Sequence, residues 1–183
     1  PNGVVPTLVH DDAVIIDSSV IIEYLEELFP EPSMGMADPV SRAHMRKWLR
    51  YFEEVPTPAI RVPSFNLHLV KHYASWTAED YAAMADSHPI RKHFYHRLGK
   101  DQFSAQETAE AMDRLDQTLV RMENALSDGR PWLMGDQLTL ADACIMPTID
   151  RLRDLGFENM WAESRPAVTG WYARYAERDA FKA

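Results

Sequence analysis

The first thirty residues change their hydrophobic period from that of strands to that of a helix. The stretches VVPTLVH and AVIID are rich in β-branched residues, and they flank HDDA, whose residues favour a turn. The pattern predicts a β-hairpin over residues 4–17 and then a helix with Asp17 or Ser18 as its N-cap. The helical period places five apolar residues on one face: Val20, Ile21, Tyr24, Leu25 and Leu28.

Proline residues separate this first unit from the rest of the chain. Pro30 and Pro32 end the helix and open the stretch PEPSMGMADP, so we interpret residues 31–38 as a linker. A two-stranded hairpin with one helix cannot enclose a core by itself. Residues 1–30 are therefore expected to be part of a larger sheet domain, whose βαβ half of roughly 30 residues or more would precede the hairpin.

The remainder of the chain, residues 39–183, follows a helical period. The clearest predicted helix runs from Ser104 to about Leu126, with apolar residues at strict three-and-four spacing. Further helices are expected over residues 39–52, from 77, over 89–99, over 139–156 and over 165–181. The three prolines of VPTPAIRVP should interrupt the chain, and Pro147 should kink its helix. The pattern predicts an all-helical domain of five or six helices.

Composition narrows the class of protein and of partner. Hydrophobic residues make up 46% and charged residues 26% of the chain, as is usual for a soluble globular protein. The net charge of −9 argues against nucleic acid or an anionic membrane as the main partner, because both select basic surfaces. The single cysteine, Cys144, fits a reducing compartment, and we expect its thiol to be an inert part of a helix core.

Histidine spacing offers a weak case for a metal. Five of the seven histidines lie between positions 68 and 96. His68 and His72 are one helical turn apart, as are His93 and His96, and such spacing can hold zinc. No glutamate follows the first histidine of HLVKH, and no third ligand is evident. We therefore interpret these histidines as solvated and predict no metal site.

Three stretches together resemble the glutathione S-transferase superfamily. NGVVPTL resembles the segment before the family's third strand, in which the Val5–Pro6 bond would be cis. DSSVIIEYLEELFP is similar to the acidic-Ser motif that opens the third helix of the thioredoxin-like domain. WLMGDQLTLADACI resembles the buried capping box of the helical domain, with Thr139 and Asp142 in a structural role. The long segment from Pro56 to Asp101 is more loosely similar to the etherase-like glutathione transferases of bacteria and fungi.

The resemblance implies a chain of class α+β/α. Residues 1–30 would be the C-terminal ββα half of a thioredoxin-like, glutathione-binding domain, and residues 39–183 the family's all-α C-terminal domain. The family's catalytic Ser, Cys or Tyr lies at the end of the first strand of the preceding half, so the catalytic residue here is unknown. The resemblance also implies a cytosolic homodimer.

Glutathione is the co-substrate that the resemblance implies, and four residues are expected to bind it: Val5, Pro6, Asp17 and Ser18. A cis bond before proline would leave the Val5 backbone free to pair with the cysteinyl unit. The resemblance implies that Asp17 contacts the γ-glutamyl end and that Ser18 binds its carboxylate, beside unpaired amides and the positive end of the helix dipole. Plain helix capping uses the same geometry, so both roles stay open.

A site for the acceptor substrate is expected in the cleft between the two domains. The stretches RKWLRYFEE and AIRVPSFNLHL flank the place where the family's acceptor would bind. Five of their residues are expected to line an apolar pocket for an aromatic substrate, unless they are plain core: Trp48, Tyr51, Phe52, Arg61 and Phe65.

These features favour a glutathione transferase that directs the glutathione thiolate at a small hydrophobic electrophile. Attack on an aryl ether is suggested only by the expanded helical segment. One alternative is a non-catalytic glutathione-transferase-like binding or regulatory module, and another is a thiol–disulfide reductase, which would need an upstream cysteine. Fold alone does not decide among these classes.

Overall fold

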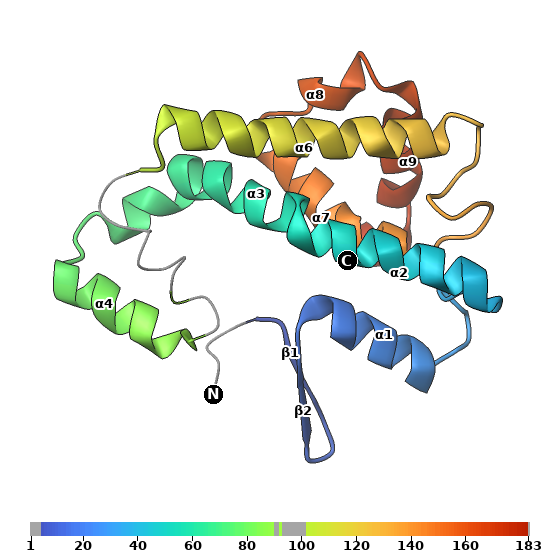
Figure 1. Ribbon diagram of the computed structural model, residues 1–183, viewed down its shortest axis with the longest axis horizontal. Coiled ribbons are helices and arrows are strands. Elements are labelled where there is room, and N and C mark those ends of the chain that lie inside the picture. Colours follow the sequence, from blue (N-terminus) through green and yellow to red (C-terminus); the bar gives the residue numbers. More distant parts are fainter. Residues whose placement is uncertain (1–4, 90–91, 93–101, 183) are drawn as a thin grey trace.

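The computed structural model describes residues 5–89, 92 and 102–182 (Figure 1). The chain begins with a hairpin and one helix, and after a linker it is helical throughout. The first part contains β1 (Thr7–His10), β2 (Ala13–Ile16) and α1 (Ser18–Leu28). The second part contains α2 (Pro39–Glu54), α3 (Pro56–Ser64), η1 (Phe65–Leu69), η2 (Val70–Tyr73), α4 (Ala78–Ser87), α6 (Ala105–Leu126), α7 (Leu140–Asp154), α8 (Asn159–Ala162), α9 (Pro166–Ala176) and α10 (Asp179–Lys182).

The hairpin confirms the predicted change of period. Strands β1 and β2 pair antiparallel, with Thr7 opposite Ile16, and Figure 1 shows the hairpin projecting away from the helices. Asp11 adopts a positive φ of 51° in the turn between them, a conformation that aspartate tolerates well. Val9 and Val14 remain 63% and 56% exposed, so the described residues leave much apolar strand surface uncovered.

Helix α1 buries only part of the face that its hydrophobic period suggests. Val20, Leu25 and Leu28 are 47%, 36% and 39% exposed, whereas Ser19 and Ile21 are buried. The reason is tertiary: α1 packs on α7, and the contact falls on the Ser19–Ile21 side of the helix. The period identified the helix correctly but not the side that the helical domain covers.

Helix α7 lies at the centre of the helical domain. It packs on α2, α3 and α9, and its residues Ala141, Ile145, Ile149 and Leu152 are all buried. The helix passes through Pro147 without a break in its helical assignment. Helix α6 packs on α3 and α9 and runs across the upper part of the molecule in Figure 1, above α3 and below α8.

The predicted capping box at the start of α7 is confirmed, and it reaches further than predicted. The amide and hydroxyl of Thr139 donate to Asp142 Oδ2 at 3.0 and 2.9 Å. Asp142 Oδ1 accepts from the Leu133 amide at 2.9 Å and from Trp171 Nε1 at 2.8 Å. Burial raises the pKa of Asp142, and these four donors oppose that shift. One carboxylate thus joins α7 to α9 and to the loop that precedes α7.

The proline-rich segment forms a helix of its own. Val55 separates α2 from α3 with φ −110° and ψ −72°, and Pro56 occupies the first position of α3. Pro63 lies inside α3, immediately before the π-helical turn η1. The predicted interruption is therefore one residue at Val55, and the rest of the segment is helical. The helix predicted over residues 89–99 lies almost wholly outside the described residues.

Candidate functional site

The start of α1 is the first of the predicted binding elements. Asp17 is its N-cap: Oδ1 accepts from the Ser19 amide at 3.0 Å, from the Ser19 hydroxyl at 3.0 Å and from the Val20 amide at 3.5 Å. A φ of 76° at Asp17 turns its carboxylate onto these donors. Ser18 is the first residue of the helix and is exposed. Its hydroxyl and its amide have no partner within the described part of the chain, so Ser18 is not used for capping.

The Val5–Pro6 bond leads into β1 and is cis, as the sequence predicted. Val5 itself is 83% exposed. The structure therefore leaves the residue that precedes β1 accessible to a ligand. The binding roles of Val5, Pro6, Asp17 and Ser18 stay predictions.

A hydrogen-bonded network joins this helix start to α2. Arg50 Nη1 donates to Ser19 Oγ and to Glu53 Oε2, both at 3.2 Å, and Arg50 Nη2 lies 3.7 Å from Glu23 Oε1. Burial raises the pKa of the Asp17 carboxyl, but the hydrogen bonds from the Ser19 hydroxyl and from the Ser19 and Val20 amides outweigh it and hold that pKa below its ordinary value. Asp17 is therefore an ionised carboxylate at neutral pH.

Sequence reasoning missed Ser19, Arg50 and Glu53. The i, i+3 spacing of Arg50 and Glu53 on a helix is a signal for a local ion pair. Nothing in the sequence indicates that the pair would meet Ser19, which lies 31 residues earlier. The contact arises from the packing of α1 beside α2.

Cys144 lies on α7 close enough to this network for its charges to act on the thiol. Burial raises the pKa of Cys144 to about 12, and the charges of Glu53 and Asp17 contribute to the shift. A thiol with such a pKa is protonated at neutral pH and is a poor nucleophile. The prediction that Cys144 is unreactive agrees with this environment, and Cys144 lends no support to a reductase.

The five residues predicted to line an acceptor pocket fall into separate clusters. Trp48 and Phe52 stack with ring centroids 5.1 Å apart, and Arg121 of α6 lies over Trp48 at 5.0 Å and over Tyr51 at 4.2 Å. Phe65 instead contacts Tyr73 and Phe103, with centroids at 6.1 and 5.8 Å. Arg61, one turn before the end of α3, is half-buried.

Helix geometry explains why these residues do not form one pocket. Trp48 and Tyr51 lie on the side of α2 that meets Arg121, whereas Arg46 and Arg50 lie on the opposite side and contact α1. Phe52 and Phe65 are 0% and 1% exposed, so they belong to the core of the described structure. The structure thus does not gather all five residues in one cluster, and which of them line an acceptor site stays a prediction.

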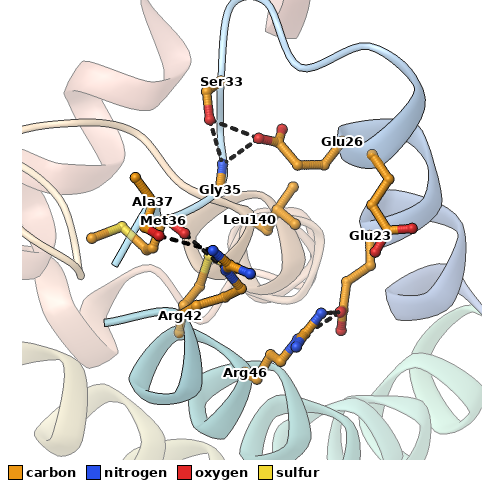
Figure 2. Close-up of a pocket in the computed structure, with 11 residues that line it drawn as sticks. Glu23, Glu26, Ser33, Gly35, Met36, Ala37, Arg42, Arg46 and Leu140 are labelled. Carbon is orange, nitrogen blue, oxygen red and sulfur yellow. Dashed lines mark hydrogen bonds and ion pairs between the residues drawn. The ribbon is translucent and has the colours of Figure 1, made fainter. Parts of the chain in front are cut away.

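Figure 2 shows a hollow of about 240 Å³ between α1, the linker and the start of α2. Its polar groups bind one another. Glu26 accepts from the Ser33 hydroxyl at 2.7 Å and from the Met34 and Gly35 amides at 2.9 and 2.7 Å. Arg42 donates to the carbonyl oxygens of residues 36 and 37, at 2.9 and 2.8 Å, and the Arg46–Glu23 ion pair closes one side. The hollow is therefore a structural junction that fixes the linker.

Two further classes of site receive no support from the part of the chain that the structure describes. Within residues 5–89, 92 and 102–182, no three histidine, cysteine, aspartate or glutamate side chains gather as metal ligands would. His93 and His96 lie outside these ranges, and His72 is exposed. None of the described helices has the length and hydrophobicity needed to cross a membrane.

Comparison with known families and curated proteins agrees with the architecture. Residues 79–179 match the C-terminal domain of glutathione S-transferases, and residues 1–33 match the N-terminal domain. The chain is 29% identical over 189 residues to protein LigF of Sphingobium sp. strain SYK-6, covering 100% of this chain and 73% of that protein. It is also 27% identical over 181 residues to the stringent starvation protein A homolog of Pasteurella multocida, covering 99% of this chain and 67% of that protein.

Solved structures give the same result. The crystal structure of the beta-etherase LigF matches with a TM-score of 0.85 at 28% identity, covering 100% of this chain and 77% of that chain. A glutathione S-transferase from Rhodospirillum rubrum matches with a TM-score of 0.71 at 24% identity, covering 99% and 70%, and supports the fold alone. The hairpin and α1 are thus part of a thioredoxin-like domain, and α2 to α10 form the helical domain that follows it. The chain belongs to the glutathione S-transferase superfamily.

Proposed function

We propose that this chain belongs to a glutathione transferase that directs the glutathione thiolate at an aromatic, aryl-ether electrophile. The observation that carries the glutathione part is the start of α1. Asp17 caps the helix alone, which leaves the exposed amide and hydroxyl of Ser18 without a partner in the described chain. An amide and a hydroxyl at a helix N-terminus are suited to a carboxylate.

The proposed pose uses both ends of the ligand. The γ-glutamyl carboxylate accepts from Ser18, and the neighbouring ammonium faces the carboxyl groups of Asp17 and Glu53. The backbone of Val5 pairs in strand fashion with the cysteinyl unit. The ligand thiol has a pKa near 8.5 when free, and the group that lowers this pKa is not among these residues. The catalytic residue therefore stays unassigned.

The proposal that the electrophile is an aryl ether rests on the similarity to a related protein. The similarity to LigF, a protein described as a beta-etherase, covers the whole of this chain. The similarity to stringent starvation protein A homologs favours a second candidate, a binding or regulatory module without transferase activity, because that name describes no enzyme. We also propose a cytoplasmic homodimer, supported by the family and by the single cysteine.

Retention on immobilised glutathione tests this proposal. The wild-type protein is expected to be retained and to elute with free glutathione. Ser18→Ala is expected to bind about tenfold more weakly, because it loses a hydrogen bond to a charged group. Ser127→Ala, which alters an exposed serine at the C-terminal end of α6, is the matched control and should behave like the wild type. Equal retention of Ser18→Ala, or no retention of the wild type, would count against the proposal.

A further inference from the structure

Arg151, near the C-terminal end of α7, is a half-buried cation without an acidic partner. Its Nε donates to Ser64 Oγ at 3.1 Å, and Ser64 is a buried residue of α3. Arg151 makes no ion pair with a carboxylate anywhere in the described ranges. A hydroxyl group is thus the only described partner of a guanidinium group with five N–H donors.

The two acidic residues nearest to Arg151 in sequence are committed elsewhere. Asp150 accepts from the Tyr172 hydroxyl at 2.6 Å, and Arg153 lies 3.0 Å from it. Arg153 also pairs with Asp154 at 3.2 Å. Two other half-buried arginines do have acidic partners: Arg153 of α7 pairs with Asp150 and Asp154, and Arg165, which precedes α9, pairs with Asp116 at 2.7 Å. Charge that is removed from water usually has a partner of opposite sign, and Arg151 departs from that rule.

The position of Arg151 connects it with the proposed glutathione site. Cys144, Thr148 and Arg151 recur at helical spacing on one side of α7. Helix α1 packs on α7 through the buried side of its first turn, and the charges of Asp17 and Glu53 act on Cys144, so this side of α7 begins beside the start of α1. Arg151 is seven residues further on, about 10 Å along the helix axis. The same side of α7 therefore runs from the proposed glutathione site to the end of α3.

A purely structural role also exists for this residue. A cation near the C-terminus of a helix interacts favourably with the helix dipole, and Arg151 and Arg153 both lie in the last turn of α7. That role explains a positive charge but requires neither burial nor the contact with Ser64. A role that is limited to the helix dipole predicts equal binding of a charged and an uncharged aromatic ligand. An experiment that compares two such ligands therefore separates the two roles.

We propose that Arg151, oriented by Ser64, binds the anionic oxygen of the aromatic acceptor, namely the aryloxide that is released when an aryl ether is cleaved. This inference rests on the proposed function. In the step concerned, the glutathione sulfur forms a bond to the ether carbon, the C–O bond breaks, and its electron pair passes to the aryl oxygen. The negative charge moves from sulfur to oxygen without a proton transfer. The guanidinium N–H groups donate to the oxygen as that charge develops.

The test compares an aryloxide with its uncharged ether. Binding of 4-nitrophenolate and of 4-nitroanisole to the full chain is measured by calorimetry without glutathione, at a pH where the phenol is ionised. The wild type should prefer the phenolate by about tenfold, as expected for a hydrogen bond to a charged group. Arg151→Gln should lose this preference while binding 4-nitroanisole as before. Arg153→Gln, two residues away and paired with Asp150 and Asp154, should keep it.

Equal affinity of the wild type for phenolate and ether would overturn the inference, and this comparison needs no variant to fold. A preference that survives in Arg151→Gln, with folding verified by circular dichroism, would also overturn it and leave the dipole role. Because neither ligand requires glutathione, failure of glutathione retention counts against the proposed function alone.

Discussion

At the scale of single residues, Asp17 and Ser18 differ in role: Asp17 caps α1, and Ser18 is proposed to bind the ligand carboxylate. Both residue types are good N-caps, so the sequence could not assign the cap. The positive φ of Asp17 settles it, because the turn directs this carboxylate onto the Ser19 and Val20 amides. Ser18 is thereby left exposed. Hydrogen bonds hold Asp17 as a carboxylate against the effect of burial, so it supplies negative charge at a helix end that otherwise favours anions.

Cys144 gives a prediction at this scale. Its pKa is raised to about 12, by burial first and then by Glu53 and Asp17, so almost none of it is thiolate at neutral pH. In the folded protein it should react with iodoacetamide about a thousandfold more slowly than an unperturbed thiol. Mass spectrometry of alkylation with and without urea measures the difference. Equal rates in the two conditions would show that the thiol is accessible and ionisable.

At the scale of elements, the linker forms hydrogen bonds both with α1 and with the helical domain. Glu26 of α1 accepts from the Gly35 amide (Figure 2) and from the Met34 amide. The Leu140 amide of α7 donates to the Met34 carbonyl at 2.9 Å. Gln137 Nε2 donates to the Gly35 carbonyl at 2.9 Å. The prolines and polar residues of this stretch predicted a linker, but not that its backbone groups would be shared between the two domains. Those contacts fix α1 against the helical domain.

Gly35→Ala tests this arrangement. An added Cβ would lie 2.7 Å from Glu26 Oε1 and 3.2 Å from its Cδ, so the Glu26 side chain must move from its hydrogen bonds. The free energy of unfolding in urea should fall by about 1–2 kcal/mol. Gly170→Ala is the control: its Cβ would meet nothing within 4 Å on helix α9, and alanine there should stabilise by about 0.5–1 kcal/mol. If Gly35→Ala is as stable as the wild type, the hydrogen bonds between Glu26 and the linker do not contribute to stability as proposed.

At the scale of the whole molecule, sequence predicted the architecture better than the site. Local signals each predicted one element: the turn residues HDDA, a cap at Asp17 or Ser18 and the capping box of Thr139 and Asp142. The order of the three motifs NGVVPTL, DSSVIIEYLEELFP and WLMGDQLTLADACI indicated the family, which the comparisons confirm. The sequence could not show which residues line an acceptor site, because a helical period assigns residues to faces without showing what covers each face. Phe52 became core, and Trp48 packed against Arg121.

The central claim is that glutathione binds where α1 begins, between the hairpin and the helical domain. The most direct test is a titration of the ¹⁵N-labelled protein with glutathione, followed by amide chemical shifts. The amides of Val5, Ser18 and Ser19 should shift most, and Ser18→Ala should weaken the response at the same positions. Shifts centred on Trp48 and Arg121, on the other side of α2, or no shifts at millimolar glutathione, would contradict the account.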